Sequence, residues 1–159
     1  MSDPAPDSPG VPFPPPLVFM GALALGFLVQ RLAPVGIGPE GSRPIVVVIG
    51  WLLVLAWLAI FLPALHAFRR ARTNIMPNQP ATAIVEAGPY RWSRNPMYVG
   101  MTLLSAGVAL VFNALWALLL VPLAVVVTDR YTIAREERYL ERAFGDVYRD
   151  YKRRVRRWL

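Results

Sequence analysis

The longest uncharged stretch of this chain runs from Pro96 to Thr128, thirty-three residues without Asp, Glu, Lys or Arg. One straight helix over these residues would be about 50 Å long, well beyond the roughly 30 Å core of a bilayer. Asn113 lies near the middle of the stretch and is a residue type that favours tight turns. The pattern therefore predicts two membrane-spanning helices, at about residues 96–112 and 114–131, joined by a very tight turn.

Two further uncharged stretches are long enough to cross a membrane. Residues 44–65 form one that is rich in Val, Leu, Ile and Trp. Residues 11–30 form a second with a proline-rich start, in which we predict a helix over about residues 17–33. No basic residue precedes the helix predicted at residues 17–33, so we expect it to be retained and not to be a cleaved signal peptide. The sequence predicts an all-α membrane helix bundle with about four spans, forming a single domain over residues 17–159. The proline-rich residues 1–16 are predicted to be disordered.

Composition excludes several kinds of chemistry. The chain has no Cys and a single His, His66, so disulfides, a cysteine nucleophile and a Cys/His metal site are excluded. The net charge of +7 needs no nucleic acid partner, because the chain has no nucleic-acid-binding motif and its basic residues cluster beside the predicted spans. Ten Lys and Arg follow Thr128, and the loop before Pro96 is also basic. This bias predicts that both termini lie in the cytoplasm.

The tail after the fourth span has helical periodicity. Gly145 is expected to end one cytoplasmic helix at Phe144, and Asp146 is expected to cap a second that runs to about Arg157, within a cytoplasmic region of residues 132–157. Apolar and aromatic side chains recur every three or four residues and form one stripe, at Tyr139, Leu140, Phe144, Tyr148, Tyr151 and Val155. The outer Lys and Arg residues, Arg157 among them, are equally consistent with contacts to anionic lipid headgroups.

Two short segments carry possible binding chemistry. In the first, Asn95 precedes Pro96 and is expected to cap a helix whose amino end, beside Arg94, attracts anions. In the second, Glu136 and Glu137 stand side by side about one turn beyond the fourth span. Each has a plain structural alternative: the acids would form surface ion pairs with neighbouring arginines, and Tyr90, Trp92 and Tyr98 would form an interfacial aromatic belt.

Together, the two segments resemble the integral-membrane methyltransferases, which include isoprenylcysteine carboxyl methyltransferases and phospholipid N-methyltransferases. The resemblance rests on Gly88-Pro-Tyr90, on Arg94-Asn-Pro-Met-Tyr-Val-Gly100, and on Glu136-Glu137 with the aromatic stripe that follows, and it covers about residues 84–157. Asn95 stands where many of the carboxyl methyltransferases have His.

The resemblance implies S-adenosylmethionine as the methyl donor and a lipid-like or prenylated acceptor that enters from the bilayer. It implies a catalytic role for Arg94, Glu137 and Arg154. It also implies a set of cofactor-binding residues: Gly88, Tyr90, Arg94, Asn95, Pro96, Tyr98, Glu136 and Glu137. In chemical terms, an acid suits the amine of the donor, Arg94 suits its carboxylate, and Tyr90, Trp92 or Tyr98 suits its sulfonium.

Two acceptor classes remain open, and a non-catalytic membrane adaptor or transporter subunit is the alternative from another functional class. A carboxylate, such as that of an isoprenylated cysteine, needs no general base, and Arg154 would be its counter-ion. A phospholipid amine must first lose a proton, and His66 is the one residue expected to titrate near neutral pH. On these grounds the sequence favours the carboxylate.

Overall fold

The structure is a computed structural model that describes residues 9–11, 13–73 and 81–159. Within these residues it is all-helical and contains no β-strand. The elements in chain order are α1 (Pro15–Leu32), α2 (Arg43–Ala71), the short 3₁₀ helix η1 (Gly88–Arg91), α3 (Pro96–Val111), α4 (Leu115–Val127), the π-helical turn η2 (Thr128–Ile133), α5 (Ala134–Phe144) and α6 (Asp146–Arg154). The predicted fold class is therefore confirmed.

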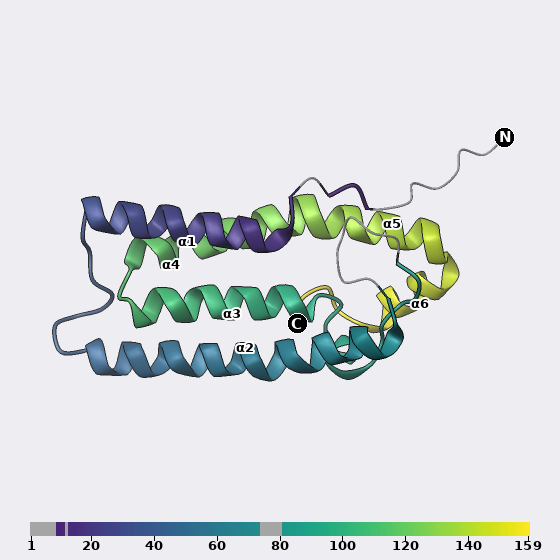
Figure 1. The fold of residues 1–159 in the computed structure, drawn as a ribbon, viewed down its shortest axis with the longest axis horizontal. Helices are drawn as coiled ribbons and strands as arrows, with labels where there is room; N and C mark the ends of the chain where they lie inside the picture. Colours follow the sequence, from purple (N-terminus) through teal and green to yellow (C-terminus); the bar gives the residue numbers. More distant parts are fainter. Residues whose placement is uncertain (1–8, 12, 74–80) are drawn as a thin grey trace.

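The long helices lie nearly parallel and form two layers (Figure 1). In one layer α2 packs along α3, and in the other α1 packs along α4, which continues through η2 into α5. The turns after α1 and α3 lie at one end of the bundle. The start of α3, the end of α2 and the pair α5–α6 gather at the other end, which we call the site end (Figure 1).

Small residues allow the helices of each layer to approach closely. A Cβ atom added to Gly107 would lie 2.7 Å from the backbone oxygen of Gly50, and one added to Gly26 would lie 2.2 Å from the Cα atom of Ala117. Such contacts between backbones are typical of helix pairs in membranes, where packing of small residues replaces the hydrophobic effect as the driving force. The glycines thus fix how α1 and α2 sit on the central hairpin.

The tight turn predicted at Asn113 is confirmed. Asn113 has a left-handed φ of 55°, which Asn tolerates better than most residues, and α4 begins two residues later. Its side-chain oxygen accepts a hydrogen bond of 2.8 Å from the backbone N–H of Ile37, in the loop between α1 and α2. The hydrogen bond therefore also joins the turn between α3 and α4 to the loop between α1 and α2.

Three helical stretches are long and apolar enough to cross a membrane: Pro15–Leu32, Arg43–Ala71 and the continuous run Leu115–Phe144. The fourth predicted span, α3, has sixteen residues and is a shorter apolar helix. The outward faces of α1 and α2 carry large exposed apolar side chains, including Leu25, Leu28, Trp51 and Leu55. The apolar helices are consistent with a membrane protein, although their lengths do not establish four spans.

The predicted boundaries require four corrections. The second helix extends to Ala71 and not to residue 65, because Phe68 and Ala71 still pack on the core at the site end. The last helix ends at Arg154 and not at 157, because the next residues run extended beside residues 93–95. Helix α1 begins at Pro15, since proline suits a first helical turn, so the final residues of the segment predicted to be disordered are helical. Gly145, not Asp146, occupies the cap position before α6. Residues 1–8 and 12 of that proline-rich segment lie outside the described residues.

Candidate functional site

A cavity of about 290 Å³ opens at the site end, at the lower end of the size range of small-molecule sites. Its walls come from the start of α3, from α5 and α6, from residues 81–85 before η1, and from prolines at the start of α1. Most of the lining is apolar, and the polar groups come chiefly from the two segments singled out in the sequence. The fold therefore brings residues about forty positions apart into one pocket.

Most of the predicted site residues line this cavity, namely Tyr90, Arg94, Asn95, Tyr98, Glu136 and Glu137. Three do not, namely Gly88, Pro96 and Arg154. Gly88 has a φ of 60° and begins η1, while Pro96 is buried in the first turn of α3, so both shape the backbone beside the cavity. Arg154 lies outside and pairs with Glu86 at 2.9 Å, with 62% of its side chain exposed.

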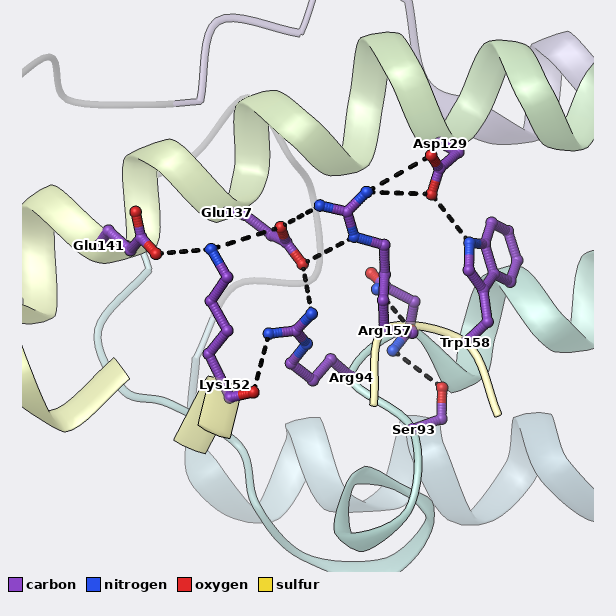
Figure 2. A network of polar contacts seen from close by, with 9 residues as sticks. Ser93, Arg94, Asp129, Glu137, Glu141, Lys152, Arg157 and Trp158 are labelled. Atoms are coloured by element: carbon purple, nitrogen blue, oxygen red, sulfur yellow. Dashed lines mark hydrogen bonds and ion pairs between the residues drawn. The ribbon is translucent and has the colours of Figure 1, made fainter. Parts of the chain in front are cut away.

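Arg94 and Glu137 form a buried ion pair. The Nη2 atom of Arg94 lies 3.0 Å from Oε1 of Glu137, and their side chains are only 8% and 7% exposed (Figure 2). Arg94 also donates to the backbone oxygen of Lys152 at 3.4 Å. Burying either charge alone would be costly, so each residue stabilises the ionised form of the other. Glu137 is thus already engaged by protein cations.

The pair belongs to a larger network that balances its own charge (Figure 2). Arg157 donates to Glu137 at 2.6 and 3.2 Å and to Asp129 at 3.4 Å, while Lys152 contacts Glu141 at 2.7 Å. The hydrogen bond to Glu137 raises the pKa of Arg157, so its guanidinium stays charged. Arg94, Lys152 and Arg157 thus face three acids, so the charges of these six residues cancel, and the exposed Arg130 lies at the edge, 3.9 Å from Asp129.

Glu136 stands apart from that network. Its Oε1 atom accepts a hydrogen bond of 2.7 Å from the hydroxyl of Tyr98, and its side chain lines the cavity. Among the described residues, no Lys, Arg or His nitrogen lies within ion-pair distance of its carboxylate. Because the neighbouring charges cancel one another, Glu136 is the acid of the cavity that a bound cation would neutralise.

Arg94 has one donor left over. Its Nε atom is buried and finds no hydrogen-bond partner among the described parts of the chain. A buried guanidinium N–H without an acceptor costs free energy of about 1–3 kcal/mol, more for a charged group, unless a ligand or water completes it. Arg94 lines the cavity, so this charged residue with an uncompleted N–H borders the space where an anionic group would bind.

Tyrosines form much of the remaining wall, at Tyr90, Tyr98, Tyr139, Tyr148 and Tyr151. Burial raises the pKa of Tyr90, Tyr148 and Tyr151 well above the usual value, so these phenols remain neutral. The hydroxyl of Tyr151 donates to the backbone oxygen of Tyr90 at 2.8 Å, which fixes α6 against η1. Neutral aromatic rings on several sides suit a cationic ligand.

Several sequence interpretations differ from the observed contacts. Asn95 occupies the cap position of α3, but its side chain donates to the backbone oxygen of Arg157 at 2.9 Å and makes no capping hydrogen bond. Trp92 is 44% exposed and does not line the cavity. His66 is exposed on α2, also away from the cavity. Arg157 contacts Asp129 and Glu137, so its guanidinium is held by protein acids and not left free for lipid headgroups.

Sequence reasoning missed three contributions to the site. The tyrosines of α5 and α6 were recognised only as an apolar stripe, although a run of tyrosines beside acids is itself a signal for a cation site. Asp129 and Trp158 were not identified, and they contact each other at 2.9 Å. Prolines at the amino end, among them Pro9, Pro14 and Pro16, also line the cavity. No sequence signal distinguishes such a wall from a linker.

Comparison with known proteins gives two matches. A profile of the phospholipid methyltransferase family matches residues 45–147, which include α3, α4 and both acids at 136 and 137. A protein of Haemophilus influenzae described as uncharacterised is 44% identical over 63 residues, which is 40% of this chain and the whole of that protein. The family match covers well over half of the chain.

Proposed function

The chain belongs to the phospholipid methyltransferase family, and from this premise we propose that it transfers methyl groups from S-adenosylmethionine to a lipid acceptor. The resemblance described from the sequence is thereby confirmed at the level of the family. The observation that carries the donor assignment is the set of groups around the cavity. Among the described residues, one small space is lined by an acid without a protein cation, by five tyrosines and by an arginine that has a buried N–H without an acceptor.

These groups match the functional groups of the donor one for one. When bound, S-adenosylmethionine supplies an electrophilic methyl group on a sulfonium, and it also carries an ammonium and a carboxylate. Glu136 would hold the ammonium, and the guanidinium of Arg94 would pair with the carboxylate. The tyrosine rings would contact the sulfonium, an interaction worth about 0.5–2 kcal/mol. We therefore assign the amine to Glu136 and not to Glu137.

Glu137 has a different task in this proposal. It is ion-paired with Arg94 at 3.0 Å and with Arg157 at 2.6 Å, so a third cation would gain little from it. Its carboxylate instead holds the guanidinium of Arg94 against the cavity. Arg94 touches the donor, whereas Glu137 acts through Arg94.

The chain's own contribution to the reaction is alignment and exclusion of water. The tyrosines and the apolar residues around them remove water from the transfer site, which strengthens every electrostatic contact within it. The fixed acid and guanidinium hold the donor at two points, so its methyl group faces one direction. Holding both reactants in the reacting geometry supplies a large part of the rate enhancement of many enzymes.

For the acceptor, the charges of the cavity favour an amine over a carboxylate. The carboxylate preferred from the sequence needs Arg154 as counter-ion, and Arg154 lies outside the cavity, paired with Glu86. The cationic side chain in the lining, Arg94, is already paired with Glu137. A lipid amine needs no cationic counter-ion, and the tyrosine wall suits it. We therefore propose a lipid amine as the acceptor.

Donor binding is the first test. The purified full chain in detergent is titrated with S-adenosylmethionine and with its demethylated product in a calorimeter. We expect saturable binding of both ligands with one site per chain. A folded protein that gives neither heat nor a thermal shift at millimolar ligand would contradict the enzyme assignment and favour the membrane adaptor.

The acceptor is tested by transfer of labelled methyl groups to phosphatidylethanolamine vesicles and, separately, to a prenylated cysteine analogue, from about pH 6 to 9. An amine is protonated at the lower end, so its rate should climb about tenfold per pH unit until the amine is neutral. A carboxylate with a pKa near 4 is ionised throughout and should give a nearly flat profile. Turnover of the cysteine analogue alone, with a flat profile, would overturn the amine.

A further inference from the structure

We propose that residues 155–158, here called the C-terminal clasp, position Arg94 and Glu137 for donor binding, with Arg157 and Asp129 as positioning residues. The inference rests on the proposed function. None of these residues other than Arg94 and Glu137 lines the cavity, so the clasp acts from behind the wall.

The clasp is first held by backbone contacts. Ser93 and Arg156 form a parallel β-bridge, and the N–H of Arg94 donates to the backbone oxygen of Arg156 at 2.8 Å. The side chain of Asn95 donates to the backbone oxygen of Arg157 at 2.9 Å. The segment that carries Arg94 into α3 is therefore built against the end of the chain, sixty residues away in sequence.

The side chain of Arg157 contacts two acids, one in η2 and one in the helix α5 that follows it. Its Nε and Nη2 atoms donate to the two oxygens of Glu137, and Nη1 reaches Asp129 at 3.4 Å (Figure 2). Asp129 lies in the π-helical turn and Glu137 in α5, eight residues further on. A planar guanidinium with several N–H groups can hold both acids at once, whereas a lysine ammonium is a single point charge.

This fork determines how Glu137 faces Arg94. The Oε1 atom of Glu137 is shared between Arg94 at 3.0 Å and Nε of Arg157 at 3.2 Å, while Oε2 is taken by Nη2 of Arg157. Lys152 lies 3.9 Å from the same carboxylate and is closer to Glu141. Without Arg157, the carboxylate is free to rotate toward Arg94 and Lys152, and the guanidinium of Arg94 moves with it.

Trp158 fixes the other side of the clasp. Its indole N–H donates to Oδ1 of Asp129 at 2.9 Å, so this carboxylate is held by both Arg157 and Trp158. Because Asp129 is only 20% exposed in its side chain, an unpaired charge there would be costly. The acid, the arginine and the tryptophan therefore form one unit.

The test is donor affinity of the full chain in detergent, measured by calorimetry for wild type, Arg157→Ala, Arg157→Lys, Glu137→Gln and the double variant Glu137→Gln/Arg157→Ala. We expect Arg157→Ala to weaken binding of S-adenosylmethionine by about tenfold, a coupling of the size seen between residues in one polar network. Arg157→Lys should recover part of the loss. The matched control is Arg153→Ala on α6, whose side chain is 73% exposed and pairs with Asp150, and its affinity should stay within about twofold of wild type.

The double variant separates positioning from general destabilisation. If Arg157 acts through Glu137, its removal adds nothing further to the loss seen in Glu137→Gln. The KM for the donor should rise in Arg157→Ala while the KM for the lipid acceptor stays constant. If Arg157→Ala does not fold, the test uses Arg157→Lys and the double variant, which removes one charge of each sign.

The outcomes distinguish the clasp from the proposed function. Wild-type affinity in Arg157→Ala, or losses that multiply in the double variant, would overturn the clasp and leave the proposed function intact. No donor binding by the folded wild-type protein would overturn the proposed function and the clasp with it. A loss in Arg157→Ala that is absent in the Glu137→Gln background supports the clasp.

Discussion

The carboxyl group of Glu136 is the feature on which the proposed donor site depends most directly, and Glu136→Gln removes its capacity for negative charge with little change in shape. The amide oxygen of Gln can still accept the 2.7 Å hydrogen bond that Tyr98 donates to Glu136. The neutral network of Arg94, Lys152 and Arg157 with their acids is left in place. The variant therefore isolates the contribution of one negative charge.

The expected loss follows from the contact that Glu136 would make. A hydrogen bond between charged groups contributes about 1.5–3 kcal/mol net, which corresponds to roughly 10- to 150-fold in affinity. Calorimetric titration should show S-adenosylmethionine binding weakened by that factor, and an analogue without the ammonium should lose little from the substitution. The matched control is Glu86→Gln, in which the same chemical change falls on the partly exposed pair with Arg154.

The reasoning fails if Glu136→Gln binds the donor as tightly as wild type. It also fails if Glu136→Gln and Glu86→Gln weaken binding equally, because an exposed pair is worth only about 0–1 kcal/mol. A result in which Glu137→Gln alone abolishes binding, with Glu136→Gln unaffected, would return the amine to Glu137.

Three further predictions concern packing, pH and the outer arginine. Gly107→Ala should lower the unfolding midpoint in detergent and reduce the free energy of unfolding by about 1–3 kcal/mol, because its Cβ would lie 2.7 Å from the backbone oxygen of Gly50. Gly21→Ala, whose Cβ would meet open space, is the control and should leave stability nearly unchanged. The free energy of unfolding should fall as the pH rises through about 10, because the unfolded chain then ionises phenols that burial keeps neutral in the folded chain, namely Tyr90, Tyr148 and Tyr151. Chemical denaturation at pH 8 and 11 measures this fall, and replacing the three tyrosines by Phe should remove it. Arg154→Ala should leave donor affinity and the KM for a lipid amine within about twofold in the transfer assay, since its ion pair is exposed; a large rise in the acceptor KM would restore its role as a counter-ion.

The sequence predicted much of this architecture, because membrane helices depend on local properties that can be read one segment at a time. Uncharged length gave the helices, and Asn113 gave the turn between α3 and α4. The two segments that supply most polar residues of the cavity were also singled out, since Arg94 and Glu137 lie in short patterns of distinctive residues. What these predictions share is that each depends on residues close together in the chain.

The remainder depends on contacts between distant residues. Helical periodicity in the tail gave no sign that Arg157 would leave the helix, because the hydrogen bonds that hold it extended come from Ser93 to Asn95. The division of labour between Glu136 and Glu137 was equally hidden. Adjacent helix positions point about 100° apart, so Glu136 accepts a hydrogen bond from Tyr98 while Glu137 pairs with Arg157, although both acids line the cavity. Only contacts with residues distant in sequence decide which acid takes which partner.

The short length of α3 bears on how a lipid reaches this site. Its sixteen residues extend about 24 Å, less than a bilayer core of roughly 30 Å, whereas the twenty-nine residues of α2 extend about 43 Å. Helix α3 packs along α2, and α2 extends beyond the amino end of α3 (Figure 1). The cavity lies at this end of α3, and most of the residues that line it are apolar. An acceptor whose tails remain in the membrane would need to move only its headgroup to reach the donor beside the tyrosine wall. This geometry favours a membrane lipid over a water-soluble amine as the acceptor.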